Sequence, residues 1–219
     1  MSDYLPCEEL HPESTATASI IWLHGLGANG HDFVPVIPML RLPSELAIRF
    51  VFPHAPSLPV TVNGGYVMPA WYDILEFGEE RKFNAAQMAA SSAAVHQLID
   101  REIERGIPSQ RIMLAGFSQG GAVNFQAALT YDKPLAGMLA LSTYFPTHDV
   151  VEVHPANAGL PITLYHGTSD SVLPLRMAMN SRRHLEALGF HPDFKTYPMA
   201  HEVCPEEIAD IASFIQAHL

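Results

Sequence analysis

The sequence predicts an α/β fold in which a mostly parallel sheet carries helices on both faces. Short apolar runs without polar alternation recur along the chain, as expected of strands that are buried on both sides. Amphipathic helical patterns separate most of these runs, which is typical of parallel strands joined by crossover helices. With 219 residues, 48% of them hydrophobic, the chain suits a single domain spanning residues 1–219 with a substantial core.

Six apolar runs predict strands, at residues 18–23, 47–52, 111–115, 136–141, 162–165 and 194–197. The first 17 residues are polar and predict an arm or a short edge element. Residues 32–40 predict a short helix whose boundaries are blurred by Pro35 and Pro38. Residues 53–83 follow no regular pattern apart from Asn63-Gly64-Gly65, which suggests a small hairpin. A loop of this length in a compact domain is usually functional.

Helical patterns cover residues 84–105, 120–130, 176–188 and 205–219. Asn84 is a suitable N-cap for the first, and Gly106 with Pro108 stops it. Pro205 suits the first turn of the last helix. The apolar stripe of that helix repeats at the spacing of one helix face, at Ile208, Ile211, Ala212, Ile215 and Leu219.

The charge balance excludes several classes of partner. The net charge is −11, so we expect no binding to nucleic acid and no attraction to anionic membrane surfaces. No apolar stretch approaches the ~20 residues of a membrane span, so membrane insertion is not expected.

Cys7 and Cys204 are too few for a disulfide framework and are expected to be free thiols. No signal peptide is recognisable, so a cytoplasmic location is expected.

The most informative stretch is Gly116-Phe117-Ser118-Gln119-Gly120, a G-x-S-x-G pentapeptide between a predicted strand and a predicted helix. A serine on such a tight turn is exposed to a substrate, and the flanking glycines avoid clashes with neighbouring backbone. The N-terminus of the following helix favours a negative charge at the same place. The sequence therefore predicts that Ser118 is a nucleophile. The alternative is a plain glycine-rich turn.

A nucleophilic serine needs a base that a third group orients, and in this topology the chain order is serine, acid, histidine. Asp170 follows the strand at 162–165 directly and is the predicted acid, although it could be a turn residue or an N-cap. His201 lies between the last strand and the last helix and is the predicted base. The acids that compete are Asp149, Asp193 and Asp210, and the competing histidines are His184, His191 and His218.

Two backbone N–H groups should form an oxyanion hole, that of Gln119 after the nucleophile and that of Leu26 in the loop His24-Gly25-Leu26-Gly27. This loop lacks the spacing and the lysine of a phosphate-binding loop. Neither H-E-x-x-H nor C-x-x-C occurs, so no metal and no cofactor are expected. The carboxyl ends of the strands should carry the whole site.

Seven motifs together resemble the phospholipase/carboxylesterase family of α/β-hydrolases, which includes acyl-protein thioesterases. They are WLHGLGANG at 22–30, FPHAP at 52–56, PAWYDI at 69–74, GFSQGGAV at 116–123, ALST at 140–143, HGTSDSVLP at 166–174 and YPMAHEVCPEEI at 197–208. The resemblance implies an α/β-hydrolase fold without a large cap domain and a serine carboxylesterase that needs no cofactor. It implies the triad Ser118, Asp170 and His201. The family often has glycine where this chain has Ala200.

The irregular stretch 53–83 is expected to form the substrate wall, with Met68 and Leu173 as substrate contacts, whereas Trp71 and Tyr72 are expected to be structural. The substrate is a small ester, or alternatively a lysophospholipid or an acylated protein. A more distant alternative is a ligand-binding α/β-hydrolase without catalysis. The resemblance also allows a homodimer.

Overall fold

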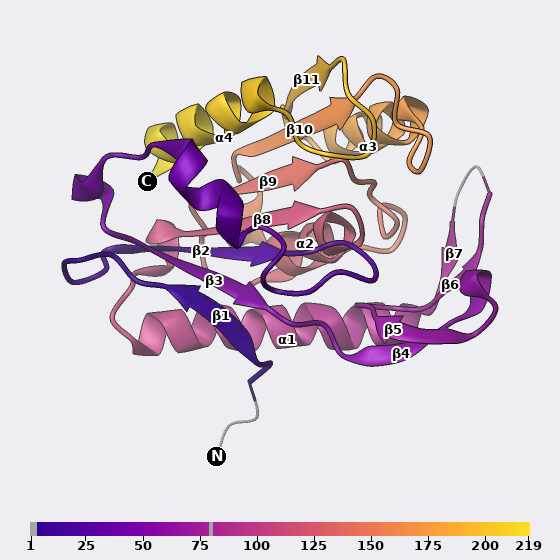
Figure 1. Cartoon of the computed structure of the whole chain (residues 1–219), viewed down its shortest axis with the longest axis horizontal. Coiled ribbons are helices and arrows are strands. Elements are labelled where there is room, and N and C mark those ends of the chain that lie inside the picture. The colour runs from indigo at the N-terminus through magenta and orange to yellow at the C-terminus, as the bar shows by residue number, and fades with distance from the viewer. Residues whose placement is uncertain (1–3, 79–80) are drawn as a thin grey trace.

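The computed structural model describes residues 4–78 and 81–219. Within these residues the centre of the fold is a seven-stranded sheet in the order β1-β3-β2-β8-β9-β10-β11 (Figure 1). Its strands are β1 Cys7–Leu10, β2 Ala18–Leu23, β3 Ile48–Pro53, β8 Ile112–Phe117, β9 Gly137–Leu141, β10 Ile162–Gly167 and β11 Asp193–Tyr197. β1 pairs antiparallel with β3, and every other pair in this sheet is parallel. The mostly parallel sheet is confirmed, and the N-terminal arm supplies an edge strand.

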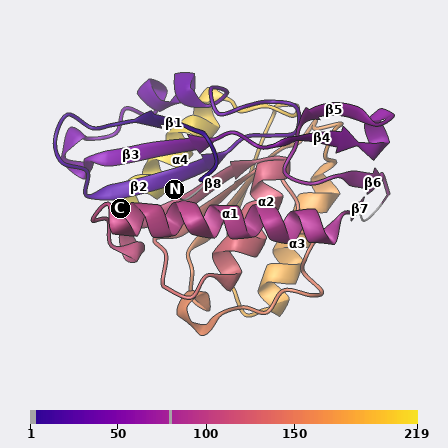
Figure 2. The same cartoon turned by 90° about the horizontal axis from the view of Figure 1, so that it is seen from below.

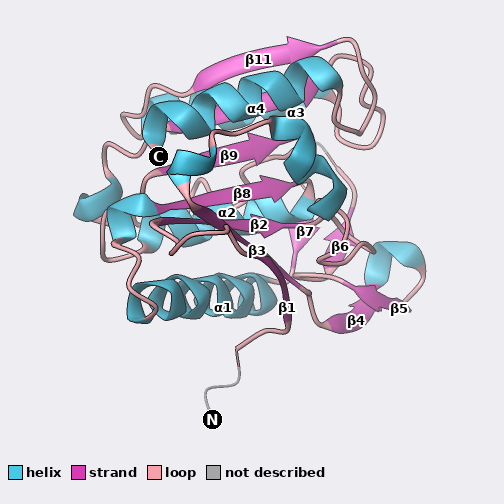
Figure 3. Ribbon diagram, turned by 60° about the vertical axis from the view of Figure 1, so that its left-hand side comes forward, coloured by secondary structure: helices cyan, strands magenta, loops and turns pink. Residues whose placement is uncertain are grey.

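Helices cover both faces of the sheet, as expected. α1 Ala85–Glu104, α2 Gln119–Thr130 and α3 Leu175–Ala187 lie on one face (Figure 2). There Leu98, Phe125 and Leu185 pack with strand residues in one buried cluster. α4 Pro205–His218 covers the other face (Figure 3), where Ile211 packs with residues such as Trp22 in a second cluster. Within the described residues, each helix is too short or too polar to span a membrane.

The first helix begins at the N-cap residue that the sequence predicts, Asn84. The Asn84 side chain accepts a hydrogen bond from the Gln87 N–H and so satisfies one unpaired donor of the first turn of α1. The expected short helix is a 3-10 helix, Val34–Leu40, with Pro38 inside it. A proline inside a helix has no N–H to donate and its ring clashes with the preceding turn of an α-helix, so a longer regular α-helix is disfavoured here.

Two antiparallel hairpins break the irregular stretch. β4 Ser57–Val60 pairs with β5 Tyr66–Pro69, and β6 Ile74–Glu76 pairs with β7 Lys82–Phe83. The first hairpin turns through Gly64 and Gly65, whose φ angles of 66° and 77° favour glycine. The hairpin predicted at residues 63–65 is therefore confirmed. Both hairpins lie beyond one end of the central sheet (Figure 1).

Two glutamates of the described part of the chain are fully buried. Glu102 on α1 binds Arg49 of β3 at 2.7 Å and Arg105 at 2.9 Å, which joins the helix to the sheet. Glu207 lies in the first turn of α4, and burial raises its pKa to about 8. Cys7 and Cys204 are free thiols, as expected.

Candidate active site

Ser118 lies on a strained turn between β8 and α2. Its φ of 53° and ψ of −120° are rare for a residue other than glycine, and they raise the hydroxyl group above the end of the sheet. The turn is possible because its neighbours have no side chains. A Cβ on Gly116 would lie 2.6 Å from the Gly121 amide nitrogen, and one on Gly120 would lie 2.6 Å from the carbonyl oxygens of Leu23 and His24.

Ser118, His201 and Asp170 form one chain of hydrogen bonds. The Ser118 Oγ lies 3.0 Å from the His201 Nε2, and the His201 Nδ1 lies 2.6 Å from the Asp170 Oδ2. The Asp170 carboxylate is fully buried, while 17% of the His201 side chain is exposed. The structure thus brings together three residues that are 83 and 31 positions apart along the chain.

Backbone groups hold the Asp170 carboxylate in place. Its Oδ1 accepts hydrogen bonds from the N–H groups of Val172 at 2.9 Å and Leu173 at 2.8 Å, which leaves the Oδ2 for His201. The buried His166 donates from its Nε2 to the Leu173 carbonyl at 2.7 Å. Burial lowers the pKa of His166 and keeps its ring neutral. His166 therefore fixes the turn that carries Asp170.

The loop of His201 packs against the strand of Asp170. A Cβ on Gly167 would clash with the carbonyl oxygens of Met199 and Ala200, so this glycine allows the two segments to approach. The side chain of Ala200 is exposed, and its backbone is not in the left-handed region. Alanine therefore fits before His201 without strain.

The two amides predicted for an oxyanion hole face no internal acceptor. Within the described part of the chain, neither the Leu26 N–H nor the Gln119 N–H donates a hydrogen bond. The loop of Leu26 is fixed on both sides, because the Gly27 N–H donates to the Pro69 carbonyl at 2.8 Å and the Trp71 indole donates to the His24 carbonyl at 2.9 Å. Both amides belong to rigid segments and are available to a ligand.

The side chain of Gln119 makes a structural contact that the sequence did not reveal. Its Oε1 accepts from the Trp71 N–H at 2.8 Å, and its Nε2 donates to the Tyr72 carbonyl at 2.7 Å. Trp71 and Tyr72 are almost completely buried, as their expected structural role requires. Gln119 thereby ties the start of α2 to the segment before β6. A lone glutamine in a pentapeptide gives no sign of such a contact.

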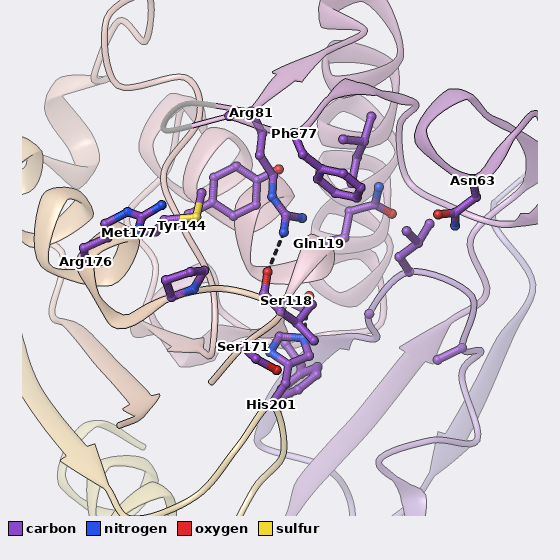
Figure 4. A pocket seen from close by; sticks show the side chains of 18 of the residues that line it. Asn63, Phe77, Arg81, Ser118, Gln119, Tyr144, Ser171, Arg176, Met177 and His201 are labelled. Atoms are coloured by element: carbon purple, nitrogen blue, oxygen red, sulfur yellow. Dashed lines mark hydrogen bonds between the residues drawn. The ribbon is translucent and has the colours of Figure 1, made fainter. Parts of the chain in front are cut away.

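A cavity of about 610 Å³ opens over Ser118 (Figure 4). Its apolar lining includes Leu26, Phe77 and Met177, and its charged lining includes Arg81, Arg176 and Asp32.

The two predicted substrate contacts do not line this cavity. Leu173 is fully buried in the core, and its backbone instead serves Asp170 and His166. Met68 is half-buried on β5, where its sulfur accepts from the Asn63 amide at 3.5 Å. Phe77 and Met177, which the sequence analysis did not single out, are among the apolar residues that line it. Nothing in the periodicity of their segments points to them.

One cluster of possible metal ligands lies among the described residues. The ligand atoms of Glu8, His31 and His54 lie within 4.8 Å of one another. However, the Gly30 N–H donates to the His54 Nδ1 at 3.2 Å, so the proton of a neutral ring lies on the Nε2. That nitrogen faces the Glu8 carboxylate at 3.1 Å and has no lone pair for a metal. The cluster fits a set of contacts that link β1 to the loop after β2 and to the segment after β3.

The parallel sheet, the serine on its strained turn and the adjoining loops define an α/β-hydrolase. A sequence profile of the phospholipase/carboxylesterase family matches residues 8–219. The chain is 36% identical over 217 residues to acyl-protein thioesterase 1 of Gibberella zeae, covering 94% of this chain and 92% of that protein. It is 36% identical to acyl-protein thioesterase 1 of Cryptococcus neoformans, covering 96% of each.

Solved structures agree with these relatives. The crystal structure of Arabidopsis thaliana SOBER1 superimposes with a TM-score of 0.87 at 32% identity, covering 92% of this chain and 98% of that one. Acyl-protein thioesterase 2 of Zea mays gives a TM-score of 0.86 at 29% identity, covering 98% and 99%. The chain belongs to the phospholipase/carboxylesterase family and is a hydrolase of esters or thioesters.

Proposed function

We propose that this protein is a serine carboxylesterase that cleaves carboxylic esters through an acyl-enzyme, with Ser118, His201 and Asp170 as its triad. The observation that carries the proposal is the unbroken chain of hydrogen bonds from the Ser118 Oγ through His201 to Asp170. This arrangement activates a serine hydroxyl group in unrelated folds, so it is recognised by its geometry.

In the first half-reaction the Ser118 Oγ attacks the carbonyl carbon of the ester while the His201 Nε2 takes its proton. The negative charge that develops on the carbonyl oxygen is stabilised by the N–H groups of Leu26 and Gln119. The tetrahedral intermediate collapses when the bond to the leaving group breaks, and His201 gives its proton to the departing oxygen or sulfur. The acyl group remains bound to Ser118 as an ester.

In the second half-reaction water takes the place of the leaving group. His201 removes a proton from the water, the resulting oxygen attacks the acyl carbon, and the proton then passes to the Ser118 Oγ. The products are the free acid and the regenerated hydroxyl group. Asp170 accepts a hydrogen bond from the His201 Nδ1, which fixes the tautomer that can act as a base and stabilises the imidazolium.

A second candidate is acyl-protein thioesterase activity, because relatives of 36% identity carry that name. The same triad can cleave both bonds, since the acyl-enzyme is identical and only the leaving atom differs. Lysophospholipids form a third class of substrate with an apolar acyl chain. Phe77 and Met177 give the cavity an apolar surface that such a chain could contact.

The experiment is a series of initial rates on p-nitrophenyl esters from acetate to palmitate, with the Ser118→Ala protein as the blank. A maximum at short chains that disappears in the variant supports the carboxylesterase. A maximum at long chains moves the assignment to an acyl-protein thioesterase or a lysophospholipase. Equal rates for the wild type and the Ser118→Ala protein at every length would refute the mechanism.

A further inference from the structure

Two arginine side chains line the cavity over Ser118. Arg81 directly precedes β7, and Arg176 is the second residue of α3, so they come from separate parts of the fold. Figure 4 shows Arg81 pointing toward Ser118, with Tyr144 between the two arginines. Two cationic groups therefore share one cavity with the nucleophile.

Neither guanidinium group is neutralised within the described part of the chain. Arg81 donates from its Nη2 to the Val172 carbonyl at 2.7 Å. Its guanidinium carbon lies 4.9 Å from the centre of the Phe77 ring and 5.5 Å from that of Tyr144. These contacts fix the direction of the side chain, and none of them is with a negatively charged group. No described carboxylate forms an ion pair with Arg81 or Arg176.

The lack of pairing matters because of where these two arginines lie. The chain has 23 acidic side chains against 12 lysines and arginines, and several described basic groups do form ion pairs, as in Arg105 with Glu102 and Lys195 with Asp210. Arg41 and Arg183 also lack an ion pair among the described residues, but they do not line the cavity, whereas Arg81 and Arg176 do. A guanidinium group in a cavity is stabilised most by an anion that accepts two hydrogen bonds from it.

Among the described residues, the acid that lines the cavity comes from a different element. Asp32 belongs to the loop after β2, which also carries Leu26. The arginines come from the second hairpin and from α3, whose N-terminus adds a partial positive charge beside Arg176. The cavity therefore has a cationic side, and an anion bound there avoids the charge of Asp32.

We propose that the substrates of this site carry an anionic group, a carboxylate or a phosphate, which Arg81 and Arg176 bind while Ser118 attacks the ester carbonyl. The inference rests on the proposed esterase function and deepens it. The anion belongs either to the acyl group or to the leaving group, and the two arms of the experiment separate these cases.

The first arm compares mono-p-nitrophenyl suberate with p-nitrophenyl octanoate, which have acyl chains of equal length. The second compares the butyrate esters of 4-hydroxybenzoate and 4-hydroxybenzamide, which place the charge on the leaving group. The readout is the ratio of kcat/KM for the anionic substrate to kcat/KM for the neutral one. A general loss of activity in a variant affects both substrates and cancels in this ratio.

In the wild type the ratio should exceed one in at least one arm. Arg81→Gln and Arg176→Gln should each lower it roughly tenfold, as expected for one lost charge-assisted hydrogen bond. Arg81→Lys should restore part of the effect. Arg182→Gln removes the same charge from α3 outside the cavity, and it should leave the ratio unchanged. If Arg81→Gln does not fold, Arg176→Gln, which changes an exposed residue, gives the same test.

A wild-type ratio of one or less in both arms would overturn the inference, as would a ratio that neither arginine substitution changes. In either case turnover of the neutral esters that depends on Ser118 would leave the proposed function intact. If no ester is cleaved, the proposed function fails. The inference is then judged by calorimetric binding of suberate, which should be weakened by Arg81→Gln and Arg176→Gln but not by Arg182→Gln.

Discussion

Replacement of Asp170 by asparagine should abolish most activity without unfolding the protein. The Asp170 Oδ1 accepts two backbone N–H groups, at 2.9 and 2.8 Å, so the amide oxygen of asparagine will take this place. The amide NH₂ then faces the His201 Nδ1, where the carboxylate Oδ2 lies at 2.6 Å in the native protein. Because the amide donates, the His201 Nδ1 must accept, and the ring proton moves to the Nε2.

This tautomer cannot remove a proton from Ser118, because the Nε2 that faces the Ser118 Oγ at 3.0 Å already carries one. The corresponding substitution in a serine protease lowers kcat by about 10⁴. A factor of 10⁴ corresponds to about 5 kcal/mol of activation free energy. Since both backbone hydrogen bonds of the turn are kept, the free energy of unfolding should change by less than about 1 kcal/mol.

The assay is steady-state hydrolysis of the best p-nitrophenyl ester, together with urea unfolding of both proteins. Asp193→Asn is the matched control, because it removes the same charge from an exposed residue at the start of β11. It should retain full activity. A loss of less than tenfold for Asp170→Asn in a folded protein would refute the role of the Asp170 carboxylate.

Three substitutions test the packing and the buried charges of the fold. Gly120→Ala places a Cβ 2.6 Å from two carbonyl oxygens, so it should destabilise the fold by roughly 3 kcal/mol or more in urea unfolding. Glu102→Ala leaves the charge of Arg49 without its partner in a mostly buried position and should cost about 3–5 kcal/mol by the same measurement. Glu207→Gln should stabilise the protein above about pH 8 but have little effect at pH 4.5, as followed by Tm against pH.

The direction in which Glu207 makes stability depend on pH follows from its raised pKa. Between its unfolded value of 4.5 and its folded value of about 8, the folded state holds a proton that the unfolded state has released. Stability therefore falls by up to about 1.4 kcal/mol per pH unit over this window, and glutamine removes the slope. If the curves of Tm against pH ran parallel for the wild type and Glu207→Gln, the buried Glu207 would not be the source of this pH dependence.

Gly120→Ala and Glu102→Ala each have a control that makes the same type of change at an exposed or open position. Gly159→Ala adds a methyl group where nothing lies within 4 Å, so it should be neutral. An equal effect at Gly120 and Gly159 would contradict the packing argument. Glu76→Gln breaks an exposed ion pair with Lys82 and should cost less than about 1 kcal/mol. A cost for Glu102→Ala as small as this would contradict the importance of its buried ion pairs.

The strands, the long helices and the order of the site residues could be predicted because their signals are local. Gly116 and Gly120 mark the turn at Ser118, and the apolar runs mark the strands that end beside Asp170 and His201. Each of these features depends on a few neighbouring residues. Once the strands are parallel, their carboxyl ends meet at one edge, and the three residues come together.

The cavity wall could not be predicted because it is made by distant segments. Leu173 lies in a turn after β10, where no periodicity fixes the direction of a side chain, and it faces the core. Met177 lies on α3 and Phe77 beside β6, and only the packing of these elements brings both to Ser118. Arg81 gives no signal at all, because it follows a stretch without a helical or strand pattern.

The most direct test of the account is labelling with a fluorophosphonate, read by intact mass and peptide mapping. We expect one adduct per chain on Ser118 in the wild type, and none in Ser118→Ala under the same conditions. Asp170→Asn should label much more slowly than the wild type, because its His201 cannot act as the base. A wild-type protein that stays unlabelled, or equal labelling of Ser118→Ala, would contradict the claim that Ser118 is an activated nucleophile.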